Sequence, residues 1–257
     1  PEQRTAFRED PERLRELREF LERSFAENFA DAVVDADSEA LAKIEAICRT
    51  HLEMQVSDPE LRHRLTPDYR AACKRLVVSG DFYDAIQRPN AVLVTDPIDR
   101  IEPGGIRTVD GTLHELDVIV LATGFHVDWF VRPMQVTGRD GVRLDDLWRH
   151  GATAYMAMAV PGFPNFFILY GPNTNGGTSI IAQLEREAEV AVSAIRRLER
   201  GMRTVDTAPK AAQQYVEWVD AELAEATSAK NSGCHNYFTD ERGNIVTEWP
   251  REHIVFW

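Results

Sequence analysis

A short apolar run that ends in three small residues constrains the fold of this chain more than any other feature. The run is VIVL, residues 118–121, and Ala122, Thr123 and Gly124 follow it directly. It lacks the alternation of a strand with one solvated face, so it predicts a strand that is covered on both faces in a parallel sheet. Small residues at such a strand end have two interpretations: they close an ordinary core strand, or they let a flat ligand approach the backbone.

A second predicted strand strengthens the ligand interpretation. Its sequence is NFFILYG, residues 165–171, and a loop rich in glycine and asparagine follows it up to Ser179. Apolar residues then recur on one stripe from Ile181 to Leu198, which predicts a long helix. The unpaired N–H groups and the dipole at the start of such a helix favour an electron-rich ligand atom. The order of strand, loop and helix is therefore typical of a binding site.

The rest of the chain divides into a helical part and an extended part. Asp10-Pro11 and Asp58-Pro59 each place proline at the first helical position after a capping residue, within a predominantly helical N-terminal region. After Ser79, short β-rich runs predict a small meander with a tight hairpin at Asp110-Gly111. Near the C-terminus we predict an amphipathic helix around residues 215–223 and an extended hairpin with its turn at residues 241–244.

Composition and charge exclude several classes of partner. The 257 residues are 44% hydrophobic and 28% charged, as in a soluble globular protein with one or two compact units. Asp and Glu total 42 against 29 Lys and Arg, so the net charge is -13, and no basic block is present. Nucleic acids and anionic membranes require clustered Lys and Arg, so neither is expected as the main partner. No apolar run approaches the roughly 20 residues of a membrane-spanning helix.

The cysteines and the first residue indicate the setting of the chain. Cys48, Cys73 and Cys234 show neither a Cys-x-x-Cys motif nor metal-ligand spacing with histidine, so a reducing, cytoplasmic setting is expected. The chain begins with Pro1 rather than Met, which predicts that it is part of a longer polypeptide or a processed product.

Several catalytic motifs are missing from the sequence. It contains no Gly-x-Gly-x-x-Gly, no P-loop, no His-Glu-x-x-His and no Gly-x-Ser-x-Gly, which excludes the common hydrolase and kinase functions. One basic pair, Lys74-Arg75, stands between a helical region and an apolar run. In an acidic protein such a pair is usually exposed and without function, and its position alone leaves both interpretations open.

Four segments carry a family resemblance. They are DPELRHRLTPDYRAACKRLVVSGDFYDAIQRPNAVLVTDPIDRIEPGGIRTVDG (58–111), DVIVLATGF (117–125), VPGFPNFFILYGPNT (160–174) and NYFTDERGNIVTEWP (236–250). Together they resemble the later half of class B flavoprotein monooxygenases, and most of all the Baeyer-Villiger type related to 4-hydroxyacetophenone monooxygenase. The similarity runs from about Leu41 to the C-terminus.

The resemblance implies an α/β fold. The chain would be part of a flavoprotein with two dinucleotide-binding domains, in which Rossmann-like sheets and a β-meander follow a helical insertion. Residues 1–70 would be the helical insertion, 71–117 the C-terminal part of the NADPH-binding domain, and 118–257 the C-terminal part of the FAD-binding domain. The implied cofactors are FAD and NADPH. The implied reaction inserts one oxygen atom of O2 into a ketone or a soft heteroatom through a flavin C4a-peroxide.

The resemblance also assigns roles to individual residues. Lys74 matches the lysine that meets the 2′-phosphate of NADPH, a role that suits a compact cation. Arg75 matches the arginine beside the flavin that stabilises the negatively charged oxygen intermediates, and a guanidinium keeps its proton in a dry site. The small residues at positions 122, 123 and 124 would clear space for FAD. The loop from Asn173 to Ser179 would face the pyrimidine edge of the flavin.

The chain departs from the family in ways that leave three alternatives. The two glycine fingerprints, the Phe-x-Gly-x-x-x-His motif and the active-site acid are absent and are expected upstream, so the chain alone should bind FAD poorly or not at all. The first alternative is a portion of a monooxygenase that needs the missing N-terminal half. The second is a relative of the disulfide reductases, which would require a redox-active cysteine pair. The third is a non-catalytic remnant that packs against a partner.

Overall fold

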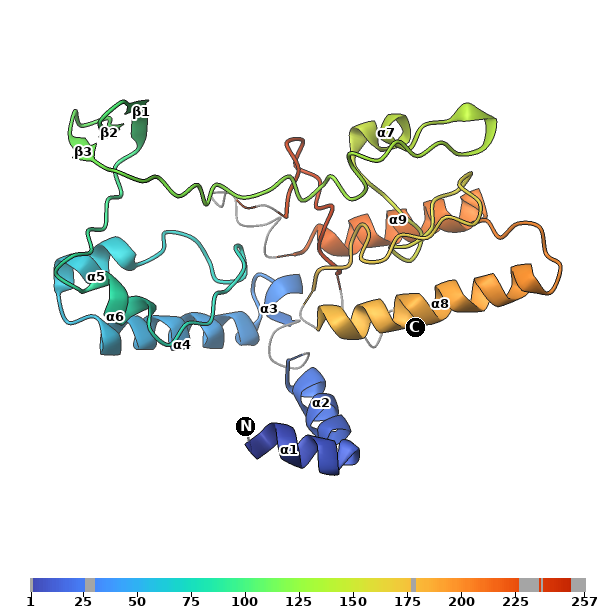
Figure 1. The fold of residues 1–257 in the computed structure, drawn as a ribbon, viewed down its shortest axis with the longest axis horizontal. Helices are drawn as coiled ribbons and strands as arrows, with labels where there is room; N and C mark the ends of the chain where they lie inside the picture. The colour runs from blue at the N-terminus through green and yellow to red at the C-terminus, as the bar shows by residue number, and fades with distance from the viewer. Residues whose placement is uncertain (1, 26–30, 177–178, 227–235, 237, 251–257) are drawn as a thin grey trace. The chain divides into compact units, whose positions relative to one another are not determined.

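The computed structural model describes residues 2–25, 31–176, 179–226, 236 and 238–250 (Figure 1). The chain separates into two compact units that interleave along the sequence. The first unit consists of Pro1–Glu45, Tyr69–Leu76 and His126–Trp257, and the second consists of Ala46–Asp68 and Val77–Phe125. The two units are defined by contacts between residues and not by cofactor binding. Our assignment of segments to cofactor domains therefore stays a prediction.

The N-terminal part of the first unit is helical, as predicted. Its helices are α1 (Glu2–Glu9), α2 (Pro11–Phe25), α3 (Asp31–Val34) and the start of α4 (Glu39–Gln55), and α2 begins at the predicted Asp10-Pro11. The Asp10 carboxylate accepts hydrogen bonds from the N–H groups of Glu12 (3.2 Å) and Arg13 (3.3 Å) at the start of α2. Ser38 Oγ accepts the N–H of Leu41 at 3.1 Å at the start of α4. Both contacts satisfy helix donors that have no partner within the helix.

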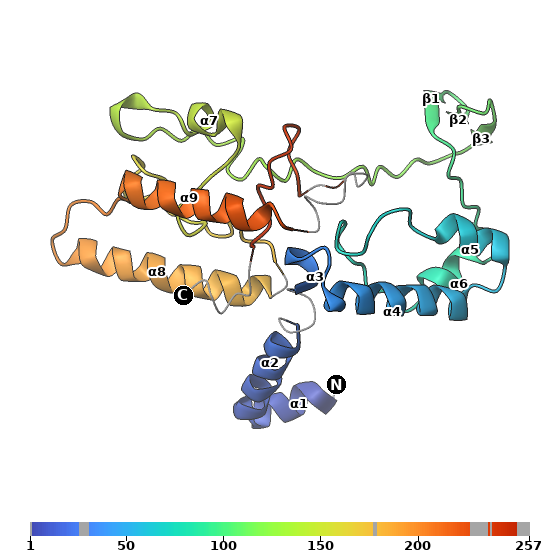
Figure 2. The ribbon, with the colours of Figure 1, turned by 180° about the vertical axis from the view of Figure 1, so that it is seen from behind.

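The larger part of the first unit is built around two long helices, α8 (Ile180–Glu199) and α9 (Pro209–Leu223). Figures 1 and 2 show them side by side and antiparallel. The remaining elements are short: the 3₁₀ turns η2 (Arg139–Gly141) and η3 (Trp148–His150), and α7 (Leu144–Leu147). One apolar cluster joins the end of α9 to Ala157 and Trp249, and a second gathers around Leu144, Phe163 and Ile168. The core of this part therefore lies where the connecting segments pack against the end of α9 and around α7.

The second unit contains the predicted meander. Its elements are the later part of α4, α5 (Pro59–Leu65), α6 (Phe82–Ile86), β1 (Ile98–Glu102), β2 (Gly105–Thr108) and β3 (Leu113–Glu115). The three strands form one antiparallel sheet in the order β1-β2-β3. The turn at Asp110-Gly111 joins β2 to β3, as predicted, and Gly111 adopts a φ of 88° that favours glycine.

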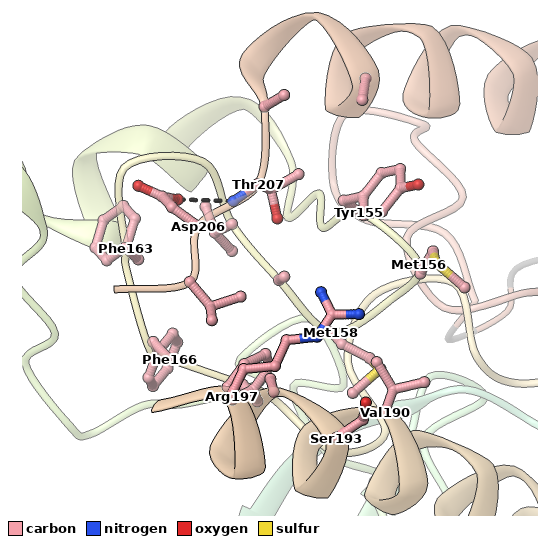
Figure 3. Close-up of a pocket in the computed structure, with 17 residues that line it drawn as sticks. Tyr155, Met156, Met158, Phe163, Phe166, Val190, Ser193, Arg197, Asp206 and Thr207 are labelled. Carbon is pink, nitrogen blue, oxygen red and sulfur yellow. Dashed lines mark hydrogen bonds between the residues drawn. The ribbon is translucent and has the colours of Figure 1, made fainter. Parts of the chain in front are cut away.

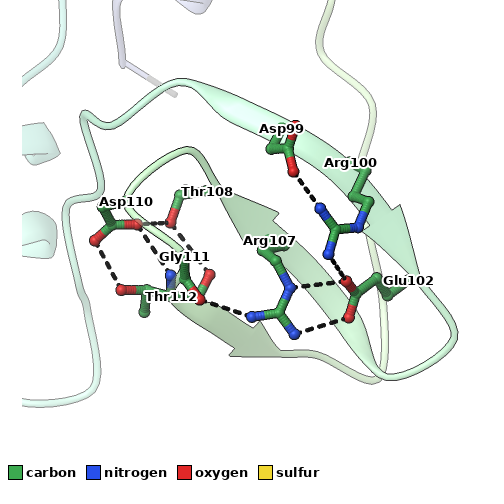
Figure 4. Close-up of polar contacts among 8 residues, drawn as sticks. All are labelled: Asp99, Arg100, Glu102, Arg107, Thr108, Asp110, Gly111 and Thr112. Atoms are coloured by element: carbon green, nitrogen blue, oxygen red, sulfur yellow. Dashed lines mark hydrogen bonds and ion pairs between the residues drawn. The ribbon is translucent and has the colours of Figure 1, made fainter.

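Side-chain contacts within the meander add to its strand pairing (Figure 4). The Asp110 carboxylate accepts hydrogen bonds from the Thr108 hydroxyl at 2.6 Å, the Thr112 N–H at 3.1 Å and the Thr112 hydroxyl at 2.7 Å. These bonds, the one from Thr108 above all, lower the pKa of Asp110 to about 2. Arg107 on β2 forms a two-point ion pair with Glu102 on β1, at 2.7 and 3.0 Å.

Two predicted strands are not formed. Residues 118–121 and 165–171 have no strand pairing, and the meander is the one sheet that the described residues contain. Val118, Val120 and Leu121 are 75%, 84% and 75% exposed, whereas the sequence predicted burial on both faces. A strand of a parallel sheet needs hydrogen-bonded neighbours. The described part of the chain supplies none for either run.

The length and the apolar character of the helices bear on whether one of them could span a membrane. None of the helices in the described ranges combines the length and the apolar character that crossing a bilayer requires.

Candidate cofactor site

The seven candidate residues lie in different units, so each group is described within its own unit. Lys74, Arg75, Asn173 and Ser179 belong to the first unit, and residues 122–124 belong to the second.

The basic pair is exposed and anchored by the residues before it. Ala72 and Cys73 are buried, and Cys73 is disulfide-bonded. The Lys74 ammonium lies 4.3 Å from the centre of the Tyr69 ring, a cation–π contact worth about 0.5–1 kcal/mol at an exposed position. The Arg75 side chain forms no ion pair or hydrogen bond with any described residue. The pair thus presents one cation held against a ring and one that is available to a ligand.

The spacing of the cysteines, which shows no Cys-x-x-Cys motif, did not predict the disulfide at Cys73. Cys234 lies outside the described residues. Spacing along the sequence detects pairs of the Cys-x-x-Cys kind, whereas the fold can bring together cysteines that are far apart in the sequence.

Residues 122–124 are all exposed. Gly124 has a φ of 93°, and a Cβ added there meets no described atom within 4 Å. In this structure the backbone conformation, rather than crowding, therefore favours glycine at position 124. That residues 122–124 clear space for FAD stays a prediction.

The loop after residue 171 is held by the C-terminal segment of residues 245–249. Asn173 is 8% exposed, and its amide donates hydrogen bonds to the carbonyls of Ile245 (2.9 Å) and Glu248 (3.1 Å). Asn175 extends the contact, because its N–H donates to Thr247 O at 2.7 Å and its carbonyl accepts from Trp249 N at 2.7 Å. The Asn173 amide therefore shapes the loop.

Ser179 stands at the open end of this loop. It occupies the cap position of α8 and is exposed, and its side chain forms no capping hydrogen bond. Residues 177–178, which complete the loop, lie outside the described residues. The first N–H groups of α8 have no side-chain cap from Ser179, so they are available to an electron-rich atom.

The sequence did not predict Glu187, which holds the other side of the loop. Its side chain is fully buried on α8, and its carboxylate accepts the N–H of Tyr170 at 2.6 Å and the amide of Gln183 at 2.8 Å. Burial raises the pKa of Glu187, and these two hydrogen bonds oppose the shift. Tyr170 has a φ of 61°, an uncommon conformation for a residue other than glycine. Glu187 thus fixes the chain just before the loop begins.

The buried face of α8 also differs from the predicted stripe. Ile181 and Ile195 are 61% and 47% exposed, whereas Gln183 and Glu187 are buried. A buried acid in a helix interior gives no signal in a pattern search, because acids normally mark the solvated face. Its spacing of four residues from the buried Gln183 is the one feature that could have indicated a shared face.

Comparison with known proteins places these features in a family context. No protein-family model matches the chain. A Mycobacterium tuberculosis protein named as an uncharacterized monooxygenase is 46% identical over 209 residues, which cover 80% of this chain and 41% of that protein. An FAD-binding monooxygenase of Aspergillus niger is 35% identical and covers 92% of this chain and 40% of that protein. A Baeyer-Villiger monooxygenase of Streptomyces coelicolor is 33% identical, with 82% and 41% covered.

Solved structures give the same result. A crystal structure of cyclohexanone monooxygenase in its open form matches with a TM-score of 0.67 at 31% identity, over 77% of this chain and 40% of that one. A steroid monooxygenase bound to NADP matches with a TM-score of 0.75 at 26% identity, over 88% and 43%. The chain spans about two fifths of the length of the relatives that it matches. By sequence and by fold, this chain is a relative of the FAD-binding and Baeyer-Villiger monooxygenases and corresponds to a segment of them.

Proposed function

We propose that the chain is the later portion of an FAD- and NADPH-dependent monooxygenase that inserts one oxygen atom of O2 into a ketone or a soft heteroatom. The observation that carries this proposal is the similarity to monooxygenases over at least 80% of the chain. The relatives reported above are not disulfide reductases, so the disulfide at Cys73 does not by itself favour that alternative.

Each unit by itself has features that suit contacts with a flavin. In the second unit, the exposed segment 122–124 leaves room at the backbone. In the first unit, the start of α8, which Ser179 does not cap, offers N–H donors beside a loop that is held by Glu187 and by residues 245–249. The sequence has no glycine-rich phosphate loop. The chain therefore supports binding of the flavin ring, and the preceding part of the enzyme must supply the phosphate contacts. When bound, the flavin supplies the chemistry of oxygen activation.

We assign different roles to the two residues of the basic pair, Lys74 and Arg75. We assign Lys74 to the 2′-phosphate of NADPH, because an ammonium held over the Tyr69 ring is a compact charge in a defined position. We assign Arg75 to the stabilisation of negative charge that develops on oxygen. Its guanidinium has no competing carboxylate among the described residues, and a positive charge of this kind stabilises a developing negative charge.

A chimera tests the proposal. Residues 1–257 replace the corresponding segment of the Streptomyces coelicolor relative, and flavin content and NADPH-dependent conversion of a panel of ketones and sulfides are measured. We expect the chimera to be yellow and active and the isolated chain to be colourless. A folded chimera that retains FAD but oxidises none of the compounds contradicts the oxygen-insertion proposal.

Variants of the chimera separate the two cations. Arg75→Ala should leave flavin reduction by NADPH within about twofold and lower oxygen insertion by about 10²–10³-fold or more, the usual loss for a residue that stabilises developing charge. Arg75→Lys is the matched control and should retain part of the insertion activity. Lys74→Ala should raise the KM for NADPH far more than that for NADH. The same change at Lys43, which pairs with Glu39, should alter neither constant.

The non-catalytic alternative keeps one supporting observation. The apolar segment of residues 118–121 and Phe125 at 93% exposure are unusual for the surface of an independent domain. In our proposal the preceding part of the enzyme covers this segment. If the chimera failed to retain FAD although it folded, a remnant that packs against a partner would become the better interpretation.

A further inference from the structure

A cavity lies in the first unit, and none of the candidate residues described above lines it. It has a volume of about 410 Å³ and lies between the C-terminal half of α8, the start of α9 and residues 155–167 (Figure 3). Its deep wall is apolar, because Met158, Val160, Phe163 and Ala194 line it and are buried. The volume falls within the range of about 300–1,000 Å³ that is typical of small-molecule pockets.

Two charged side chains line this cavity, Arg197 and Asp206, and their situations differ. The Asp206 carboxylate accepts the N–H groups of Gly162 (3.1 Å) and Thr207 (2.9 Å) and pairs with Arg139 at 3.2 Å. The Arg197 guanidinium has no ion pair or side-chain hydrogen bond within the described part of the chain. Figure 3 shows the Arg197 side chain rising from α8 toward Met158. The cavity thus has one cation whose charge is not compensated.

The positions of charge and apolar surface specify a ligand class. Arg197 is an exposed residue at the rim, whereas Met158 and Phe163 are 2% and 4% exposed in the interior. A guanidinium recognises a carboxylate with two parallel hydrogen bonds. We propose that this cavity binds a small amphipathic monocarboxylate, with its carboxylate on Arg197 and its apolar tail against Met158 and Phe163. The proposal does not depend on the flavin site.

Calorimetric titration of the 257-residue chain with octanoate and octanamide tests the charge requirement. The two probes share the same tail and differ in the charge of the head group. We expect octanoate to bind at least tenfold more tightly than octanamide. Arg197→Gln should reduce octanoate to the affinity of octanamide, whereas Arg196→Gln, at the preceding position of α8 and outside the cavity lining, should preserve the difference. Equal binding of the two probes, no binding of either, or a preference that survives Arg197→Gln overturns the proposal.

A second variant tests the location. Ser193 lines the cavity from an exposed position of α8, so Ser193→Phe narrows the cavity without disturbing buried packing. We expect it to weaken both probes at least tenfold and to leave the thermal unfolding temperature unchanged. If both probes bind Ser193→Phe as they bind the unaltered chain, they bind elsewhere, for example at residues 118–121, and the assignment to this cavity is wrong.

Discussion

The two predicted strand ends with small residues differ in burial and in hydrogen bonding in the structure. In the first unit, the loop from Gly171 to Asn175 is buried or partly buried and is bonded to residues 245–249. In the second unit, residues 118–124 are exposed and unpaired by any described strand. Both carry small residues after an apolar run, so the sequence signal alone does not separate them.

The difference lies in where each segment finds its hydrogen-bond partners. The loop after residue 171 meets partners that are more than 70 residues away but still within the chain, as the bond from Asn173 to Ile245 shows. Residues 118–121 need a neighbour on each side, and the described residues provide none. The loop is thus held in place by this chain, whereas the exposed segment has no hydrogen-bonded strand neighbour among the described residues. Four predictions test this contrast, beginning with the largest effect.

Alanine at the two glycines should give opposite outcomes. A Cβ at Gly171 would lie 2.1 Å from the carbonyl oxygen of Ala157, so Gly171→Ala forces the backbone apart and should destabilise the first unit by about 3 kcal/mol or more. A Cβ at Gly124 meets no described atom, so Gly124→Ala adds only backbone strain of about 1 kcal/mol or less in a segment that can relax. Urea unfolding of both variants measures the difference. Equal losses of stability would contradict the contrast.

Removal of one amide tests the partners of the loop. Asn173→Ala deletes two hydrogen bonds to buried backbone carbonyls, and we expect a loss of about 2–3 kcal/mol in the free energy of unfolding. Val120→Asp is the counterpart in the exposed segment, where Val120 is 84% exposed, and should change stability by less than about 0.5 kcal/mol. A large effect of Val120→Asp in the isolated chain would mean that the segment is already packed in solution.

Local signals account for most of what the sequence predicted correctly. The caps at Asp10 and Asp58, the start of α8 after Ser179 and the turn at Asp110-Gly111 each depend on a few adjacent residues. Such features form from side chains and backbone within one turn, so they persist whatever surrounds them.

The incorrect predictions concern structure that depends on distant residues. Whether residues 118–121 form a strand depends on neighbours, not on the run itself. The role of Glu187 was not predicted, because its carboxylate serves Tyr170, which lies 17 residues away. For the candidate site, the sequence identified an exposed cationic pair and a loop beside a helix start, but not the buried groups that fix the loop.

The third prediction concerns the pH dependence that Glu187 creates. Burial raises its pKa in the folded chain, so the stability associated with its neutral form is complete below the ordinary pKa of glutamate and is lost as pH rises through the folded value. One such group changes the free energy of unfolding by at most about 1.4 kcal/mol per pH unit. In Glu187→Gln this decline should disappear, because an amide does not ionise. The fold should be kept, because the new amide oxygen can accept the Tyr170 N–H and a turned Gln183 amide can pair with the new side chain.

Denaturant unfolding at several pH values from 4 to 8 measures this effect. Glu189→Gln, an exposed change on the same helix, is the control and should follow the unaltered chain. If stability fell with rising pH equally in Glu187→Gln, another group would be responsible and the buried acid would not be the cause.

The smallest effect is expected at the Asp110 turn. The hydrogen-bond donors to Asp110 all come from Thr108 and Thr112, whereas residues 118–124 of the same unit have no strand neighbour among the described residues. Hydrogen bonds from Thr108 and Thr112 lower the pKa of Asp110 to about 2 from an ordinary value of 3.8. The stabilisation is present above pH 3.8 and is lost as pH falls toward 2.

The Thr112 N–H, which donates to Asp110, should therefore report a titration midpoint near pH 2 in NMR spectra of the isolated chain. Thr108→Val removes the largest contribution and should move the midpoint upward, because the carboxylate loses its 2.6 Å donor. A midpoint near 3.8 in the unaltered chain would show that the turn, too, depends on structure that the chain does not provide.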